Sequence, residues 1–231
     1  MDKIEVERAA TTLHQEIWAQ RALIWPEGHP HPVAMLDPRV VITKVLGYEY
    51  EVRDKIGGDG SRQRGASAGG FFDRGRGIVA ISASFSEEVQ RYTAAHEIGH
   101  ALLHPWVGDK VIHRDVPLGS ADNGSRLKHE KEADYFAACF LMPRRLMKRA
   151  FTARFGSEVP LHRNETVDFY LSGSENTGFF SASADSLKFS SMLARAESFG
   201  QRRFESMAMA FRVSVRAMAI RIQELGFVSS Y

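Results

Sequence analysis

The segment His96-Glu97-Ile98-Gly99-His100 constrains the fold of this 231-residue chain more than any other feature. It lies inside residues 84–105, where the capping pair Ser84 and Glu87 and the closing Pro105 predict one helix. Residues four apart lie one above the other on a helix face, so the two imidazoles can reach a single cation. The sequence therefore predicts a packed helix with a metal site on one face.

A second predicted helix, over residues 125–143, offers the remaining ligand of such a site. A catalytic zinc ion takes three protein ligands and leaves a fourth position open. Glu130 and Asp134 are four residues apart and share a face, so we expect Glu130 to bind the ion and Asp134 to accept the free ring N–H of a ligand histidine. Glu132 lies about 200° around the helix from Asp134 and is the alternative ligand if the register differs.

Glu97 follows the first histidine by one residue and so points about 100° around the helix from it. It does not readily join the same tetrahedron of ligands, but it can reach a water molecule whose pKa the ion lowers to about 7. We therefore expect His96, His100 and Glu130 to bind one zinc ion per chain, and Glu97 to act as general base on the zinc-bound water in peptide hydrolysis. The same ligand set also suits manganese or iron.

Other candidate residues near the motif have ordinary structural roles that we favour. His104 ends the helix, and we expect it to bond backbone rather than metal. His113 is either an oxyanion-stabilising group or an ordinary loop residue, and Cys139 is expected to be a small buried apolar residue. The hairpin predicted over 69–82 is either an ordinary sheet element or an exposed edge that pairs with an extended substrate.

The rest of the chain alternates between helical periods and turn-rich segments. Apolar positions three and four apart predict a helix within 3–25, and a proline-rich connector follows over 26–38. Further along, the patterns predict a strand over 40–52, alone or after a short helix, an aperiodic polar stretch over 156–191, and helices over 192–228 with a break near 211–214. We expect an N-terminal helix and connector (1–39), a catalytic domain (40–143), a variable polar insertion (144–190) and a C-terminal helical element (191–231).

Composition narrows the class of function. The net charge is only +2, which does not by itself argue for nucleic acid or an anionic membrane as partner. The single cysteine excludes an internal disulfide framework and fits a reducing compartment. Because the sequence also lacks a secretory signal and a run of about 18 apolar residues, we expect a cytoplasmic protein with no membrane partner.

Two motifs and the strand before them carry a family resemblance. They lie at residues 91–104, 130–143 and 78–81, and the second contains Glu-Lys-Glu-Ala-Asp and closes on Leu-Met-Pro. These segments resemble the ImmA/IrrE family of metallo-endopeptidases. Many members have asparagine where this chain has Asp134, and either side chain can orient a ligand.

The resemblance implies an α+β fold: a compact zincin-like domain in which a small twisted sheet packs with the two motif helices. It implies zinc held by His96, His100 and Glu130, with Glu97 catalytic. It also implies a protein substrate, because members typically cut or otherwise inactivate a helix-turn-helix transcriptional repressor. Transcription regulation in a stress response is the expected setting.

Residues 213–221 look like the second half of a helix-turn-helix, an element that some family members carry. Arg212, Arg216 and Arg221 are expected on its exposed side, where a recognition helix contacts phosphates and bases. We favour a helical hairpin that packs on protein, because no complete DNA-reading motif is evident and the charge is modest. The alternative to hydrolysis is a regulatory protein that binds a repressor or DNA through the zincin scaffold and the C-terminal helices.

Overall fold

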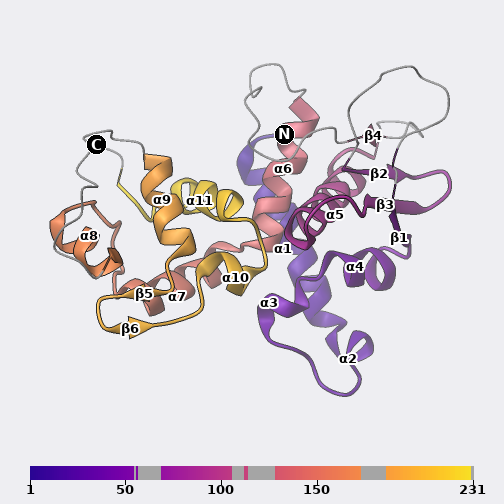
Figure 1. The fold of residues 1–231 in the computed structure, drawn as a ribbon. Coiled ribbons are helices and arrows are strands. Elements are labelled where there is room, and N and C mark those ends of the chain that lie inside the picture. Colours follow the sequence, from indigo (N-terminus) through magenta and orange to yellow (C-terminus); the bar gives the residue numbers. More distant parts are fainter. Residues whose placement is uncertain (55, 57–68, 106–111, 114–127, 173–185, 230–231) are drawn as a thin grey trace. The chain divides into compact units, whose positions relative to one another are not determined.

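The computed structural model describes residues 1–54, 56, 69–105, 112–113, 128–172 and 186–229. Within it the chain separates into two compact units, Met1–Leu141 and Met142–Tyr231. The first unit combines a small mixed sheet with helices, which confirms the α+β class (Figure 1). The finer division into four segments stays a prediction.

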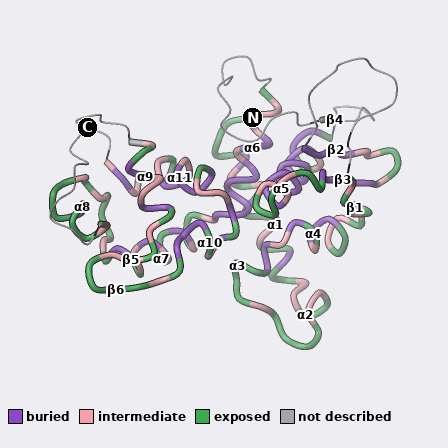
Figure 2. Tube along the Cα trace, viewed as in Figure 1, coloured by how far each residue is buried: buried purple, intermediate pink, exposed green. Residues whose placement is uncertain are grey.

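The sheet of the first unit has the strand order β1-β3-β2-β4. Its strands are β1 (Glu49–Arg53), β2 (Gly70–Asp73), β3 (Ile78–Ser82) and β4 (Ile112–His113). Strand β1 runs parallel to β3, and β2 runs antiparallel to both β3 and β4. Every residue of β3 is buried, as expected of a central apolar strand covered on both faces (Figure 2).

The predicted hairpin over 69–82 is confirmed, with the turn between β2 and β3. Asp73 starts it by accepting a hydrogen bond from the backbone N–H of Arg76 at 3.0 Å, and Gly77 ends it at a φ of +68°. Both strands are paired on both sides, β3 by β1 and β2 by β4. This pairing favours the ordinary sheet element over the alternative of an exposed edge that pairs with substrate.

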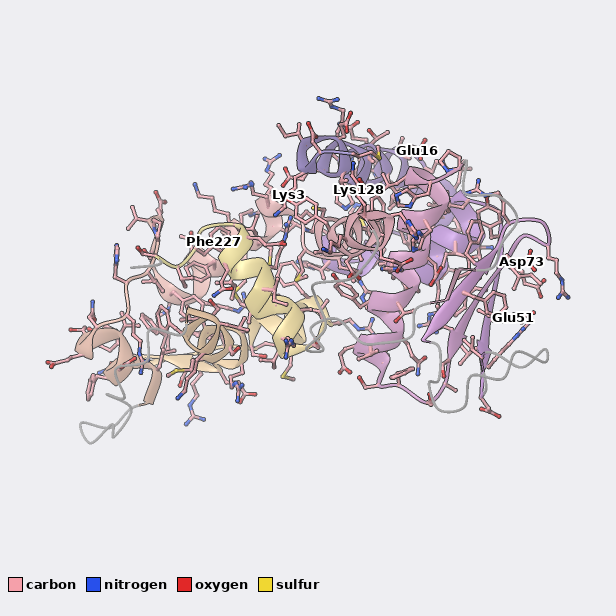
Figure 3. The ribbon with its side chains drawn as sticks, turned by 90° about the horizontal axis from the view of Figure 1, so that it is seen from above. Lys3, Glu16, Glu51, Asp73, Lys128 and Phe227 are labelled. Carbon is pink, nitrogen blue, oxygen red and sulfur yellow. The ribbon has the colours of Figure 1, made fainter. Side chains whose placement is uncertain are left out.

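The predicted N-terminal helix is confirmed as α1 (Lys3–Ala19), which a capping box of Asp2 and Glu5 begins. It buries one stripe at spacings of three and four, made of Val6, Ala10, Leu13 and Ile17. In Figure 3 helix α1, on which Lys3 and Glu16 are labelled, lies beside α6, the helix that begins at Lys128. Short helices follow α1 as far as the sheet: α2 (Arg21–Ile24), α3 (Pro32–Met35), α4 (Pro38–Val40) and the π-helical turn η1 (Val41–Val45).

Helix α5 (Glu87–Leu103) is the predicted first motif helix, but it begins later than expected. Ser86, not Ser84, is its N-terminal flanking residue, and the side chain of Ser84 instead meets that of Ser82 at 2.7 Å. The predicted capping box of Ser84 and Glu87 is therefore wrong, because Ser84 belongs to the turn that leaves β3. Along its length α5 packs on β2, β3 and α6.

Helix α6 (Lys128–Leu141) is the predicted second motif helix, and the expected start at Ser125 lies outside the described residues. It approaches α5 most closely at Gly99, where an added Cβ atom would stand 3.1 Å from Ala133 Cα and 3.2 Å from Phe136 Cδ1. A glycine at this point lets the two helix backbones meet.

The second unit, Met142–Tyr231, is mainly helical, with α9 packed against both α10 and α11. Its helices are α7 (Arg144–Phe155), α8 (Glu165–Ser172), α9 (Ser186–Arg195), α10 (Met207–Phe211) and α11 (Val215–Glu224). A small hairpin of β5 (Ser198–Phe199) and β6 (Arg202–Arg203) separates α9 from α10.

Two expectations for this unit need correction and one is confirmed. The stretch 156–191 holds α8 and the start of α9, although α8 is too short to show a clear period. Arg221 is buried, not exposed: its Nε donates to the carbonyl of Met142 at 3.2 Å and its Nη1 pairs with Glu224 at 3.0 Å. The predicted break is confirmed at Arg212, which has a φ of +53°.

Among the residues that the structure describes, no helix combines the length and the apolar composition needed to cross a bilayer.

Candidate metal centre

Helices α5 and α6 bring three side chains together at one point. The Nε2 atoms of His96 and His100, one turn apart on α5, are 2.9 Å apart. Glu130, in the first turn of α6, places Oε2 3.3 Å from His96 Nε2 and Oε1 3.4 Å from His100 Nε2. All three donor atoms therefore lie within 4.8 Å of one another, as no other group of His, Cys, Asp and Glu in the described part of the chain does.

These separations fit a tetrahedral zinc ion. With metal–ligand bonds of about 2.0–2.1 Å, the ligand atoms of a tetrahedral site lie about 3.3–3.4 Å apart. Both histidine–glutamate separations have this value, each to a different oxygen of the carboxylate, and the two histidine nitrogens are closer, at 2.9 Å. Two imidazole nitrogens and one carboxylate are also a donor set of catalytic zinc sites, although manganese and iron accept it too.

Burial and pairing put His100 and Glu130 in the protonation states that bind metal. Burial lowers the pKa of His100 to about 4, against the hydrogen bond with Glu130, which raises it. Burial raises the pKa of Glu130, but its hydrogen bonds with His100 and His96 outweigh that effect and hold the pKa well below its usual range. At neutral pH the site thus offers a neutral imidazole at His100 beside an ionised carboxylate.

Asp134 supports the first histidine of the motif. Its Oδ1 lies 2.9 Å from His96 Nδ1, on the side of the ring away from Glu130. The hydroxyl of Tyr92 donates to the main-chain carbonyl of Asp134 at 2.8 Å, which ties α5 to this turn of α6. A carboxylate in this place fixes the ring with its proton on Nδ1 and leaves Nε2 for a metal ion.

Glu97 is completely buried, one residue after His96 in α5. Carboxylates are almost never fully buried without a partner or a function, so its position inside the unit beside the three converging donors is notable. A carboxylate there can exchange a proton with a water molecule at the open corner of the site.

The structure adds to the site two contacting residues, His104 and Glu132, that sequence reasoning missed. His104, buried at the end of α5, turns its Nδ1 to His100 Nδ1 at 3.2 Å and its Nε2 to Glu132 Oε2 at 2.9 Å. The expectation that His104 bonds backbone is confirmed for its main-chain N–H, which donates to the carbonyl of His100, but its ring contacts side chains. The signal was present in the sequence as a third histidine at the same spacing of four.

Glu132 accordingly faces His104 and is not among the three converging donors. It also pairs with Lys128 Nζ at 3.8 Å and with the terminal amine of Met1. Burial raises the pKa of Glu132, but hydrogen bonds from the amine and from His104 lower it by more than burial raises it, and the net shift is downward. Glu132 is therefore an ionised acceptor at neutral pH.

The remaining candidate residues lie at the margin of the centre. His129 Nε2 is 3.4 Å from Glu130 Oε1, and its ring centroid is 5.9 Å from that of His100. The backbone of His113 pairs with Phe71 in β4, while its side chain lies outside the described part of the structure. Cys139 is buried in α6, as predicted.

Known proteins match the segment of the chain that holds this site. The family described as the IrrE N-terminal-like domain matches residues 59–167. Those residues belong to the ImmA/IrrE family. Over 76 residues the chain is 38% identical to the radiation response metalloprotease IrrE of Deinococcus radiodurans, a match that covers 32% of this chain and 22% of that protein. The chain thus spans about a fifth of the length of this curated relative.

The IrrE N-terminal-like segment contains α5, α6 and every residue of the centre described above, and it ends in α8. It is similar to a segment of a metalloprotease, and its His96, His100 and Glu130 could hold a metal ion. Helix α1, which packs on α6, precedes the matched segment.

Proposed function

We propose that the chain is a zinc-dependent endopeptidase that cleaves a peptide bond in a protein substrate. The observation that carries the proposal is the convergence of His96, His100 and Glu130 in the first unit, with the buried Glu97 next to the first histidine. A matching IrrE N-terminal-like segment supports it.

The chain's own residues supply the ligands, the proton transfers and the orientation. A zinc ion, when bound by the three donors, supplies Lewis acidity that makes a water molecule acidic and polarises the scissile carbonyl. Glu97 takes a proton from the attacking water and delivers it to the nitrogen of the leaving amine. Asp134 holds His96 in the tautomer that leaves Nε2 free for binding.

The Glu97→Gln variant tests this role, because it keeps the shape of the side chain and removes the base. It should retain about one zinc ion per chain and lose cleavage by a factor of at least about 100, in line with removal of a general base. The assay is mass spectrometry of fragments after incubation with purified helix-turn-helix repressors. A variant that cleaves as fast as wild type would show that Glu97 is not the base.

The substrate class within this proposal is a helix-turn-helix transcriptional repressor. The resemblance to the ImmA/IrrE family supports it. The name of the relative, a radiation response metalloprotease, fits a setting in a stress response. Cleavage of a repressor would couple this centre to transcription in a stress response. If the wild-type protein cut unrelated unfolded proteins and left folded repressors intact, this substrate class would be wrong.

A second candidate function, DNA binding, is favoured by one feature of the second unit. Helices α10 and α11 are joined by three residues, with Arg212 in the left-handed region and Ser214 capping α11, a connection of helix-turn-helix length. Arg212 and Arg216 are exposed there, although Arg221 is not.

Fluorescence anisotropy with a labelled duplex tests this second function. Joint replacement of Arg212 and Arg216 by alanine should weaken binding and reduce the salt slope by about 2, one for each lost phosphate contact. Arg195→Ala, which changes an exposed arginine on α9, is the matched control. Absence of binding at low salt by the wild-type protein would exclude the function.

A further inference from the structure

The two candidate ligand histidines are supported in different ways on the side away from Glu130. His96 Nδ1 meets a carboxylate directly, at 2.9 Å from Asp134 Oδ1. His100 Nδ1 instead meets another imidazole, His104 Nδ1, at 3.2 Å. The far nitrogen of that ring, His104 Nε2, lies 2.9 Å from Glu132 Oε2.

These contacts allow one arrangement of protons when His100 binds a metal ion. A ligating Nε2 carries no proton, so the neutral His100 ring is protonated on Nδ1. That N–H can donate to His104 only if His104 Nδ1 is an acceptor, which places the His104 proton on Nε2. Glu132 then accepts that proton, and the hydrogen bonds run in one direction from His100 through His104 to the carboxylate.

We propose that His104 and Glu132 are positioning residues of the metal centre, which fix the orientation and tautomer of the His100 ring and place a carboxylate charge behind it. The proposal rests on the proposed function in one respect, that His100 is a metal ligand. Residues outside the ligand set that orient ligand histidines in this way contribute about 10-fold to 100-fold to metal affinity.

Burial and helix geometry support a built contact rather than a chance one. His104 is 2% exposed and the Glu132 side chain 12% exposed, so water competes little for their hydrogen bonds. His100 and His104 are one helical turn apart, which keeps the rings adjacent. The contact between His104 and Glu132 also links the end of α5 to α6, the same pair of elements that carries the three donors.

Zinc affinity, measured by competition with a chromophoric chelator at fixed pH, tests the proposal. His104→Phe keeps a ring but removes the acceptor, and should weaken zinc binding between about 10-fold and 100-fold. His104→Asn offers an amide oxygen near the position of Nδ1 and should recover part of that loss. Glu132→Gln should weaken binding less than His104→Phe, because it acts through the intervening ring.

The double variant of His104→Phe with Glu132→Gln separates positioning from general destabilisation. If Glu132 acts through His104, the double variant binds zinc no more weakly than His104→Phe alone. A further loss of zinc affinity that adds fully to the first would show that Glu132 does not act through His104. His104→Phe affinity within twofold of wild type would overturn the proposal outright.

A spectroscopic readout on the unmodified protein keeps the test independent of whether a variant folds. Two-bond ¹⁵N–¹H correlations of the histidine rings in zinc-loaded wild type should show His100 protonated on Nδ1 and His104 protonated on Nε2. A proton on His104 Nδ1 would contradict the proposed direction of the hydrogen bonds.

The matched control is His14→Gln, which replaces another histidine of the same unit. His14 Nε2 bonds the carbonyl of Phe140 at 2.9 Å, away from the converging donors, so zinc affinity should be unchanged. The two proposals can fail separately. Wild type that binds zinc but cleaves nothing contradicts the endopeptidase proposal, and the zinc-affinity test of His104 and Glu132 still applies. Wild type that binds no zinc overturns both.

Discussion

Ionisable side chains are packed into the interior of the first unit with little access to water. His96, Glu97 and His100 are all at most 1% exposed. Burying such groups costs stability unless partners or a cation compensate. Asp134 is the partner on the outer side of the His96 ring, and His104, itself paired with Glu132, is the partner on the outer side of the His100 ring. Glu130 lies on the inner side of both rings. The arrangement as a whole has the charge and donor set that a divalent cation completes.

Glu130→Gln tests the third donor at the level of a single residue. The amide keeps the shape of the side chain but removes the negative charge and one good ligand oxygen. We expect zinc affinity to fall by more than the roughly 100-fold upper value for a supporting residue. Chelator competition measures the loss, with Glu88→Gln in the exposed first turn of α5 as control. An affinity within tenfold of wild type would mean that Glu130 is not a ligand.

The sequence predicts which residues converge better than it predicts what supports them. His96, His100, Glu130 and Asp134 come from spacings of four on single helices, which the helix repeat fixes. The contact between His104 and Glu132 depends on the rotation of α5 relative to α6. No repeat within one helix encodes that rotation, so Glu132 could be placed on its own helix but not opposite its partner.

At the scale of elements, the approach of α5 to α6 sets the geometry of the centre. A side chain at Gly99 would press on the backbone of Ala133, which lies between Glu130 and Asp134 on the facing helix. The same turn of α5 carries both candidate histidines. The lack of a side chain at Gly99 therefore affects both the packing of α5 on α6 and the distance from the histidines to Glu130.

Gly99→Ala should destabilise the protein, although alanine is the better helix former by up to about 1 kcal/mol. The added Cβ meets Ala133 backbone at 3.1–3.2 Å, tighter than ordinary contact, and overpacking of this kind costs about 1–3 kcal/mol. Urea unfolding measures the net loss, and zinc affinity should fall with it. A variant as stable as wild type, or more stable, would show that α6 shifts to accept the added Cβ without loss of stability.

His14 gives the contact between α1 and α6 a dependence on pH. Burial lowers its pKa, partly offset by the hydrogen bond to the Phe140 carbonyl, which raises it. The unfolded chain therefore takes up a proton at His14 more readily than the folded one. Stability is fully present above the unfolded pKa of about 6.5 and declines as the pH falls below it.

Urea unfolding of wild type and His14→Gln at pH 7.5 and pH 5.5 tests this sign. Glutamine can still donate to the Phe140 carbonyl but does not titrate. We expect the wild type to lose more stability than the variant between the two pH values, because only it carries the shifted group. Equal losses in both proteins would show that His14 does not contribute to the pH dependence.

Local patterns were sufficient for the elements that have strong periods, and insufficient for pairings between distant segments. Helix α1 and the hairpin of β2 and β3 follow from the stripe of Val6, Ala10, Leu13 and Ile17 and from two apolar runs around a turn. The parallel pairing of β1 with β3 joins segments 25 or more positions apart, and its register of Glu49 with Ile78 depends on tertiary packing.

At the scale of the whole molecule, the mild net charge conceals two units of opposite sign. Residues 1–141 carry 17 Lys and Arg against 20 Asp and Glu, whereas residues 142–231 carry 13 against 8. The candidate metal centre is in the acidic unit and the exposed Arg212 and Arg216 are in the basic one. Composition averaged over the chain therefore understates the case for a polyanionic partner of the second unit.

Zinc should stabilise the first unit selectively, because all three candidate ligands belong to it. At a free concentration 100 times its dissociation constant, a ligand that binds only the folded state adds about 2.7 kcal/mol, which corresponds to about 100-fold slower hydrogen exchange through unfolding of that unit. Hydrogen exchange with and without a chelator should show this slowing in α5 and α6 but not in α11. His100→Ala should abolish it, and equal protection of α11 would instead mean that zinc stabilises both units as one.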